Sequence, residues 1–245
     1  MTRLRSGSPH GTAGSSSGSA KKLHAGEAGG QEGPRRRPQR RALETRDALL
    51  AAALSEFAER GYDAASIRSI GLRTGLQHPL ITYHFRTKEI LWRAVAENAF
   101  AEIRRLWDEG EKSALEGVPA IERLRGEYAT FLRFTVDHPD FHHFMLRENR
   151  PGNPRLPWLV ETILLPTLER VLPQIRAAQA EGDLPVGDPT LIHYMLIGMT
   201  SVLSSLRDEI SLTAGLDIGS RAIIDSYLQL LDGFVFRQSG THEPD

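Results

Sequence analysis

The sequence has 245 residues, of which 40% are hydrophobic and 25% charged, and its formal net charge is −1. This length supports a hydrophobic core and more than one domain. Because the chain has no cysteine, a disulfide framework, a thiolate metal site and a thiol redox switch are excluded.

The charge is divided unevenly along the chain. Residues 1–41 contain nine Lys or Arg and two Glu, a net charge of +7, whereas the remainder contains 21 basic and 29 acidic residues, a net charge of −8. The first residues lack the apolar segment of a signal peptide, and the most apolar later stretch, residues 191–206, is interrupted by His193 and by hydroxyl side chains. We therefore expect a cytoplasmic protein with no membrane span.

Residues 1–41 are rich in Gly, Ser, Pro and Arg. Such a segment buries too little apolar surface to offset its ordering entropy, which predicts a disordered basic tail. It ends in P-R-R-R-P-Q-R-R, which places Arg36, Arg37 and Arg40 just before the first predicted helix. Two interpretations stay open: an arm that enters a narrow minor groove of DNA, or a solvated tail that adds only salt-sensitive affinity.

From Thr45 to Arg60 apolar residues recur on one helical face, and Gly61 is expected to end that helix. Residues 66–88, S-I-R-S-I-G-L-R-T-G-L-Q-H-P-L-I-T-Y-H-F-R-T-K, then predict two short helices joined by a tight corner. Ser66 suits the N-cap of the first helix, and Gly75 suits the left-handed residue that turns the chain. This is the pattern of a helix-turn-helix.

Three more residues fit this corner. Gly71 is small, as required where two helices cross closely after a short turn. Pro79 falls in the first turn of the second helix, where its missing N–H costs nothing. Thr87 is expected to cap a third helix.

The second short helix sorts its side chains by face. Ile81 and Phe85 lie four residues apart and are predicted to point inward. The other face has no Lys or Glu and offers amide, imidazole, hydroxyl, phenol and methyl groups, which are the types that contact base edges and phosphates. Lys88, at the start of the next helix, is expected to hold a phosphate. The outward residues are Gln77, His78, Leu80, Thr82, Tyr83 and His84.

The remainder of the chain reads as further helices. Apolar periodicity predicts helices at about 88–109, 118–138, 140–147, 158–181, 188–208 and 218–237. Pro166 and Pro173 interrupt the fourth of these, so that a kinked helix and two shorter ones are both open. No alternating strand pattern occurs, and the predicted fold class is all-α.

Residues 45–95 resemble the DNA-binding domain of TetR-type transcriptional regulators. The resemblance runs from the helix T-R-D-A-L-L-A-A-A-L-S-E-F-A-E-R-G-Y to the Y-H-F-x-x-K signature at Tyr83, His84, Phe85 and Lys88. Two residues depart from the family pattern, since most members carry Ala in place of Gly71 and many carry a phosphate-contacting Tyr in place of Thr82. The substitution at Gly71 costs helix propensity, about 1 kcal/mol.

The resemblance implies a domain organisation and a function. We expect a helix-turn-helix domain at residues 42–88, a helical effector-binding and dimerisation domain at 89–238 and a disordered tail at 239–245. The expected protein is a homodimer, paired through its last two helices, that binds double-stranded DNA at a near-palindromic operator and is released by a small, partly apolar effector. The expected DNA-contacting residues are Ser66, Arg68, Gln77, His78, Pro79, Leu80, Thr82, Tyr83, His84 and Lys88, with Arg36, Arg37 and Arg40 from the tail.

Dimerisation would use the apolar stripes of the last two helices. The first stripe comprises Leu191, Met195, Gly198, Met199, Val202 and Ser205, and the second comprises Ile223, Ile224, Tyr227, Leu228, Leu231, Phe234 and Val235. One recognition helix reads only a few base pairs, so useful specificity also favours two copies on two half-sites.

The effector cavity implied by the resemblance would lie among the middle helices and would be mixed aromatic and aliphatic. Its expected lining residues are Trp107, Tyr128, Phe131, Phe141, His142, Phe144, Met145, Trp158 and His193, with Phe134, Leu165, His143, Arg147 and Glu148 as further candidates. For each of these residues, plain core packing is the competing interpretation.

Other classes of function have less support in the sequence. His138 and His142 have the spacing of two metal ligands on one helix turn, but Pro139 lies between them and marks a new helix start, so no metal site is predicted. No phosphate-binding glycine loop, H-E-x-x-H motif or nucleophile-base arrangement occurs, and neither a catalytic residue nor a cofactor is predicted. A DNA-binding dimer whose C-terminal domain serves dimerisation alone remains as the alternative.

Overall fold

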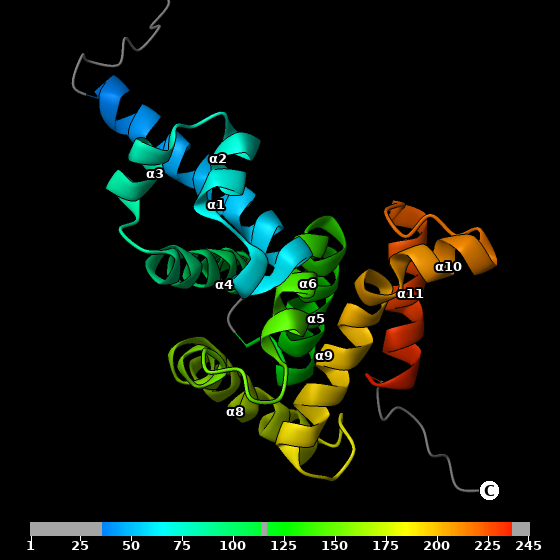
Figure 1. The fold of residues 1–245 in the computed structure, drawn as a ribbon. Coiled ribbons are helices and arrows are strands. Elements are labelled where there is room, and N and C mark those ends of the chain that lie inside the picture. The colour runs from blue at the N-terminus through cyan, green and yellow to red at the C-terminus, as the bar shows by residue number, and fades with distance from the viewer. Residues whose placement is uncertain (1–35, 114–116, 237–245) are drawn as a thin grey trace, which may run out of the picture. The chain divides into compact units, whose positions relative to one another are not determined.

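The computed structural model describes residues 36–113 and 117–236, with side chains from Arg40 to Gly110 and from Gly117 to Phe236. The chain divides into two units, Met1–Gln39 and Arg40–Asp245, and the hydrophobic cores belong to the second. All regular secondary structure of the described residues is helical (Figure 1), which confirms the predicted all-α class. Most of the predicted N-terminal tail and the segment 239–245 lie outside the described residues.

Three helices form the N-terminal head: α1 (Arg36–Ala64), α2 (Ile67–Thr74) and α3 (His78–His84). The backbone of α1 starts nine residues before Thr45, so the predicted end of the tail at residue 41 is wrong. Pro38 does not prevent this start, because a proline in the first turn removes no helical hydrogen bond. Gly61, with φ 75°, interrupts α1 as predicted, and one further turn carries the chain to Ala64.

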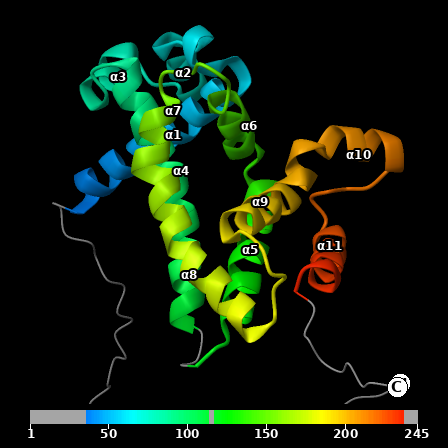
Figure 2. The same ribbon diagram turned by 90° about the horizontal axis from the view of Figure 1, so that it is seen from below.

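The remaining helices follow the predicted order with shifted ends. They are α4 (Lys88–Ser113), α5 (Ala120–Asp137), α6 (Pro139–Glu148), α7 (Leu156–Leu159), the π-helix η1 (Val160–Leu164), α8 (Leu165–Glu181), α9 (Pro189–Ser205), α10 (Arg207–Ala214) and α11 (Arg221–Phe234). In the two views of Figure 1 and Figure 2, α10 and α11 lie on the opposite side of α9 from α8.

The segment from Leu156 to Glu181 is helical without a gap, and it is therefore not split into two separate helices. A π-helical turn at η1 joins the short α7 to α8, and Pro166 stands in the first turn of α8. Proline has no N–H to donate to the carbonyl four residues earlier, and the wider turn accommodates that missing bond. Pro173 lies inside α8 without ending it.

The break between α9 and α10 was not predicted. One continuous helix to residue 208 was expected, but Leu206, with φ −111° and ψ 19°, ends α9 and precedes α10. Arg207 donates from its guanidinium to the carbonyl of Val136 on α5, a contact between distant segments that no local residue pattern signals. Among the described helices no single one is long and apolar enough to cross a membrane, whereas α9 and α10, which meet at a bend of 61°, meet that criterion as a pair.

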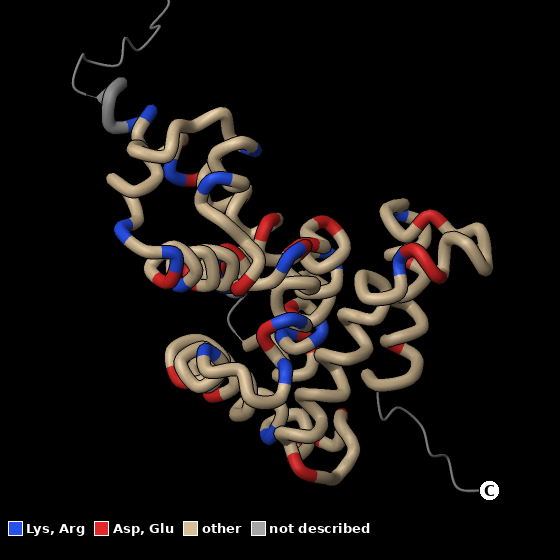
Figure 3. Tube along the Cα trace, viewed as in Figure 1, with Lys and Arg blue, Asp and Glu red and all other residues tan. Residues whose placement is uncertain are grey.

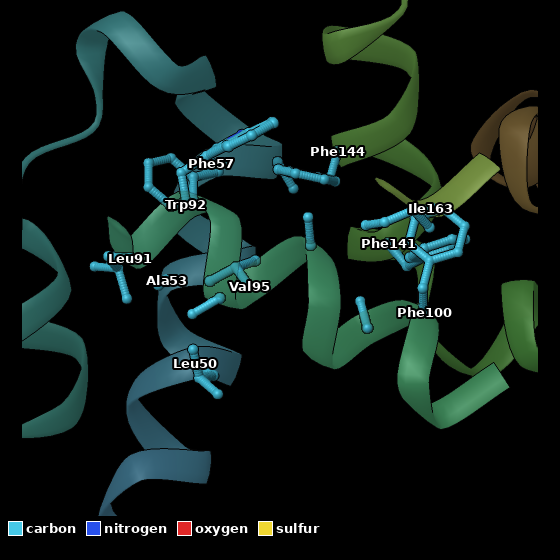
Figure 4. Packing of buried hydrophobic residues seen from close by; sticks show 14 of the residues in the cluster. Leu50, Ala53, Phe57, Leu91, Trp92, Val95, Phe100, Phe141, Phe144 and Ile163 are labelled. Atoms are coloured by element: carbon cyan, nitrogen blue, oxygen red, sulfur yellow. The ribbon is translucent and has the colours of Figure 1, made fainter. Parts of the chain in front are cut away.

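The largest hydrophobic core crosses the expected domain boundary at residue 88. Figure 4 shows Phe57 of α1 and Trp92 of α4 beside Phe144 of α6, and the same cluster continues to Ile163 of η1. Burial of an aromatic or aliphatic side chain of this size contributes about 1.5–3 kcal/mol. The head is therefore fastened to α4 and α6 by a shared core. A second core is formed by α5, α8, α9 and α11.

Candidate DNA-contacting head and ligand cavity

The corner between α2 and α3 has the predicted construction. Ser66 caps α2, and its hydroxyl accepts from the backbone N–H of Ser69 at 3.0 Å. Gly75 adopts the left-handed conformation at φ 69°. A Cβ on Gly71 would lie 2.9 Å from the carbonyl oxygen of Leu76 and 3.2 Å from Cδ1 of Ile81, so this crossing requires glycine. Capping occupies the hydroxyl of Ser66, which was expected at the DNA.

The buried and exposed faces of α3 are those predicted. Ile81 is fully buried and Phe85 nearly so, which seats the helix on the head. Gln77, His78 and Pro79 are exposed at its start, and Leu80 and Tyr83 are 39% and 81% exposed. Thr82 and His84 are half-buried. In Figure 3 the trace of α3 carries neither charge colour from end to end.

The hydroxyl of Thr82 is engaged within its own helix. It donates to the carbonyls of His78 at 3.0 Å and Pro79 at 3.1 Å. The single hydroxyl hydrogen is thus shared inside α3, and only the oxygen lone pairs remain for a ligand. Thr82 therefore offers no donor to a phosphate in this conformation.

Lys88 has a different role from the predicted phosphate contact. Its ammonium donates to the carbonyls of Tyr62 at 2.8 Å, Ala65 at 3.1 Å and Asp63 at 3.2 Å, and it lies 4.5 Å from the ring centre of Tyr62. An ammonium has three N–H donors, and these carbonyls take all of them. Lys88 therefore caps the end of α1 in this structure, and its contact with a phosphate stays a prediction.

A buried carboxylate braces α1 against α2. Glu56, at 0% exposure, accepts from the hydroxyl of Ser69 at 2.5 Å and from Nε of Arg73 at 3.0 Å, and Arg60 lies 3.3 Å away. Arg73 also pairs with Glu59. Burial of a carboxylate is tolerated where such partners satisfy it. Arg73 is therefore a structural cation of the head.

Other arginines of the head remain available for an anionic partner. Arg68 and Arg86 are exposed, and within the described part of the chain neither forms an ion pair or hydrogen bond. Arg46 lies over the ring of Phe85, 5.8 Å from its centre. Arg86 directly precedes the capping segment of α4 but was absent from the predicted site, because sequence spacing does not distinguish a free cation from a paired one.

The arginines expected from the tail fall partly outside the description. The backbone of Arg36 and Arg37 begins α1, but their side chains lie outside the described residues. Arg40 is exposed and pairs with Glu44 at 3.2 Å. As a helical residue, Arg40 belongs to α1 rather than to a flexible arm.

A cavity of about 370 Å³ lies among α4, α5, α6, α7, η1, α8 and α9. It contains six of the predicted lining residues: Trp107, Phe131, Phe141, His142, Met145 and His193. The other lining residues were not predicted: Phe100, Ile103, Arg104, Leu146, Asn149, Leu156, Val160, Leu164, Thr167, Tyr194, Ile197 and Ser201.

Several predicted lining residues lie elsewhere. Phe144 is fully buried in the first core, where its ring centre is 5.9 Å from that of Trp92. Trp158 lies 5.4 Å from Trp92 and carries Arg93 on its ring. Tyr128 does not line the cavity, but its hydroxyl forms a hydrogen bond with the lining residue His193. Phe134, Leu165 and His143 are likewise not part of the lining.

Arg147 and Glu148 also differ from expectation. Arg147 of α6 donates to the carbonyls of Ala58 and Glu59 on α1. Glu148 is 1% exposed and accepts from Trp92 Nε1 and Arg155 Nε, each at 3.1 Å. Arg147 thus holds α6 to the head, and Glu148 holds it to α4 and to the loop that follows α6, so that neither side chain is available to a cavity ligand.

The two cavity histidines are neutral. Burial lowers the pKa of His193 to about 4, and burial together with the nearby His143 lowers the pKa of His142. His193 Nδ1 lies 2.8 Å from the phenol oxygen of Tyr128, whose pKa is raised by burial. Because the protonated phenol has no other partner among the described residues, it donates to Nδ1, and His193 keeps its own hydrogen on Nε2.

His142 is fixed by a similar argument. The hydroxyl of Ser205 donates to the carbonyl of Ser201 at 2.9 Å and lies 2.6 Å from His142 Nε2. Since its one hydrogen is already used, the hydroxyl accepts from the imidazole N–H. His138 ends α5 and His142 lies within α6, and among the described residues no three His, Cys, Asp or Glu are placed to hold a metal ion.

Fold and site together define a helix-turn-helix protein with a cavity in its helical body. Residues 49–95 match the family model for bacterial regulatory proteins of the tetR family. The HTH-type transcriptional repressor Rv3405c of Mycobacterium tuberculosis and the HTH-type transcriptional regulator Mb3439c of Mycobacterium bovis are each 44% identical over 59 residues, which is 24% of this chain. That match spans 31%, about a third, of the length of these curated relatives.

Solved structures share the arrangement of helices. The ketosteroid transcriptional regulator KstR2 of Mycobacterium tuberculosis aligns with a TM-score of 0.61 at 19% identity, over 79% of this chain and 95% of its own. FadR of Bacillus subtilis, solved with stearoyl-CoA, aligns with a TM-score of 0.57 at 21% identity, over 76% of this chain and 96% of its own. The head of this chain, residues 49–95, is thus similar to tetR-family regulators, and the helical body shares the fold of the solved structures.

Proposed function

We propose that this protein is a cytoplasmic homodimeric transcriptional repressor that binds a near-palindromic operator and is released by a small molecule. The observation that carries the proposal is α3, which presents uncharged polar side chains on a head braced by buried contacts. Rigid elements position side chains more accurately than loops do, and sequence-specific contact with base edges requires such accuracy. The relative Rv3405c is itself named a repressor.

The proposed DNA contacts divide into two classes. Gln77, His78, Leu80, Tyr83 and His84 lie on or beside α3 and are proposed to read base edges or shape. The exposed Arg68 and Arg86 are proposed to contact phosphates, in the role first expected of Lys88. Phosphate contacts orient the protein on the duplex, whereas base contacts carry the specificity.

Dimerisation through α9 and α11 is supported by their exposed apolar side chains. On α9, Leu191 is 64% exposed and Met195 59% exposed, and Gly198 is open to solvent; on α11, Leu230 is 56% exposed and Phe234 81%. Exposed apolar side chains on these two helices supply the kind of surface that a protein partner covers. A second copy of the same helices would cover it under two-fold symmetry.

Helix α6 is proposed to carry the effector signal. Phe141, His142 and Met145 of α6 line the cavity, while Asp140 accepts from Ser55 of α1 and Arg147 binds the carbonyls of Ala58 and Glu59. A ligand that shifts α6 must therefore act on α1, and with it on the spacing of two heads. By linkage, such a ligand lowers DNA affinity only as far as it prefers the spacing that does not fit the operator.

The apolar cavity supports an effector with an apolar body. The neighbours FadR and KstR2 are described, respectively, as a complex with stearoyl-CoA and as a ketosteroid regulator. A cavity of about 370 Å³ falls within the usual range for small-molecule sites, about 300–1,000 Å³.

Selection from random duplex DNA at near-physiological salt tests the proposal. The expected result is enrichment of a near-palindrome with half-sites about one helical turn apart, or a multiple of that spacing. His78→Ala or Gln77→Ala should then lose about 1–3 kcal/mol of discrimination at one operator position and leave the others unchanged. Binding that is never enriched for a sequence and vanishes as salt rises would contradict the proposal.

The coupling role of α6 has its own test. Arg147→Gln should leave operator affinity nearly unchanged and reduce the release of DNA by any ligand found to bind the cavity. Arg133→Gln on α5 is the matched control, since its partner at 3.7 Å is Asp225 of α11 and not the head. Equal ligand responses of the two variants would remove α6 from the mechanism.

A further inference from the structure

We propose that the effector is a monocarboxylate: a compact apolar molecule with one carboxylate, which binds Arg104. This inference rests on the proposed function, because it names the class of ligand for the same cavity. It is carried by the charges of the lining, by the hydrogen-bond donors of the lining residues and by the size of the cavity.

The apolar part of the ligand follows from the walls. Aromatic rings and aliphatic side chains make up most of the lining, among them Phe100, Trp107 and Phe131. The cavity volume of about 370 Å³, at about 30 Å³ for each water-sized group, accommodates about a dozen non-hydrogen atoms. A carboxylic acid of eight to ten carbons has that size.

The carboxylate follows from Arg104. Among the described lining residues, Arg104 is the one side chain with a full charge, and it lies on the same face of α4 as Phe100, Ile103 and Trp107. It is half-buried, and within the described part of the chain it forms no ion pair or hydrogen bond. Neighbouring arginines of α4 are paired: Arg93 with Glu89, and Arg105 with Glu102 and Glu109. An arginine in the wall of the cavity without a paired acid is satisfied by a ligand that brings one.

The other polar groups of the lining also favour a ligand with a negative charge. The hydroxyl hydrogens of Ser201 and Thr167 are used on the carbonyls of Ile197 and Ile163, each at 2.7 Å. Donors remain on the Nε2–H of His193 and on the side chains of Asn149 and Tyr194. Among the described residues, the lining contains no Asp or Glu. The ammonium of an amine ligand would therefore be repelled by Arg104 with no acid to compensate. A carboxylate would pair with Arg104 and accept hydrogen bonds from the remaining donors.

Binding of matched ligands to the full-length protein tests this inference. The probes are decanoate, 1-decanol and decylamine below their micellar concentrations, measured by calorimetry and by the shift in melting temperature. Decanoate should bind most tightly and raise the melting temperature, since a ligand of the native state stabilises it. Decanol should bind about 10- to 100-fold more weakly, the factor expected for loss of a charged hydrogen bond, and decylamine more weakly still.

Two arginine variants assign the charge. Arg104→Gln should weaken decanoate about 10- to 100-fold and leave decanol nearly unchanged. Arg105→Gln, one residue away and outside the cavity, should leave both affinities as they are. Arg104→Lys keeps the charge and should recover part of the decanoate affinity, which distinguishes a binding role from a merely structural one.

The outcomes separate this inference from the proposed function. Equal binding of decanoate and decanol, unchanged decanoate binding in Arg104→Gln, or no binding of any probe would each overturn the monocarboxylate assignment without touching operator binding. Decanoate binding that depends on Arg104 but does not release operator DNA would uphold the assignment and reject the effector mechanism.

Discussion

Lys88 holds the end of α1 to the start of α4. Its ammonium lies against three backbone carbonyls and the ring of Tyr62, in a half-buried position. The carbonyls at the end of a helix have no intrahelical partner, and a cation there satisfies them. Lys88, the lysine of the Y-H-F-x-x-K signature, therefore stabilises the packing of the head against α4.

Lys88→Met should lower the free energy of unfolding by about 1.5–3 kcal/mol, because it leaves these carbonyls without their charged donor. Urea unfolding measures this change. Arg86→Ala is the matched control: it should leave the unfolding free energy unchanged, weaken DNA binding at every sequence and flatten the salt dependence by about one unit. If Lys88→Met instead keeps full stability and weakens DNA binding uniformly, Lys88 holds a phosphate after all.

His193 makes the stability of the body depend on pH. Its pKa is about 4 in the folded protein, below the ordinary value of 6.5, because the imidazole is buried. As pH falls from about 6.5 to about 4, the unfolded chain takes up a proton at this residue and the folded chain does not. Stability contributed by the neutral imidazole is therefore present above pH 6.5 and is lost toward pH 4, by about 3 kcal/mol.

The double variant His193→Leu with Tyr128→Phe removes the titrating group together with its partner. Its unfolding free energy should vary less between pH 7 and pH 4.5 than that of the unchanged chain. Urea unfolding at several pH values gives the comparison. Parallel pH profiles for the two proteins would show that acid destabilisation arises at other groups, such as His142, whose pKa burial also lowers.

The close crossing of α2 and α3 is possible because residue 71 is a glycine and has no Cβ atom. Leu76 and Ile81 leave no room for a methyl group on Gly71. The Cβ of any other residue would push α3 away from α2 or displace the turn. Position and tilt of the DNA-contacting helix therefore follow from this contact.

Gly71→Ala should lower the unfolding free energy by about 1–3 kcal/mol, the usual effect of overpacking. Gly126→Ala is the matched control, because this glycine lies inside α5 with no atom within 4 Å of its added Cβ. That change should raise the unfolding free energy by about 0.5–1 kcal/mol through helix propensity. Effects of the same sign in both variants would show that propensity, and not the crossing, decides the outcome at Gly71.

Across the chain, the head and the helical body are connected rather than separate. One hydrophobic core joins α1 to α4, α6 and η1, and Arg147, Glu148 and Lys88 add polar contacts at the same junction. Packed contacts rather than a flexible linker therefore connect the body to the head. Two such chains, paired through α9 and α11, would couple cavity occupation to head spacing.

The dimer proposal predicts that Phe234→Glu and Met195→Glu each shift the protein toward the monomer and weaken operator binding. A charge placed in the apolar surface that the partner covers cannot be solvated in the dimer. Sedimentation velocity measures the oligomeric state. Leu212→Glu on α10, where the side chain is 87% exposed and off these stripes, is the control and should remain dimeric. A monomeric unchanged chain would contradict the proposal directly.

The sequence by itself determined the all-α class and most of the helix-turn-helix. Caps, turn glycines and apolar spacing are local signals, and they placed Ser66, Gly75, Pro79, Ile81 and Phe85 correctly because their effects act within a few residues. The helix order of the body followed from the same periodicity, although the break at Leu206 carries no Gly or Pro to announce it.

Only the tertiary structure decided which side chains are free. Lys88, Arg73, Arg147 and Glu148 look alike in sequence to cations and acids that face solvent, yet each finds its partners on a helix distant along the chain. Arg104, by contrast, finds none among the described residues. Pairing of charges and the lining of a cavity depend on how helices pack, and helical periodicity specifies which face is buried but not what it is buried against.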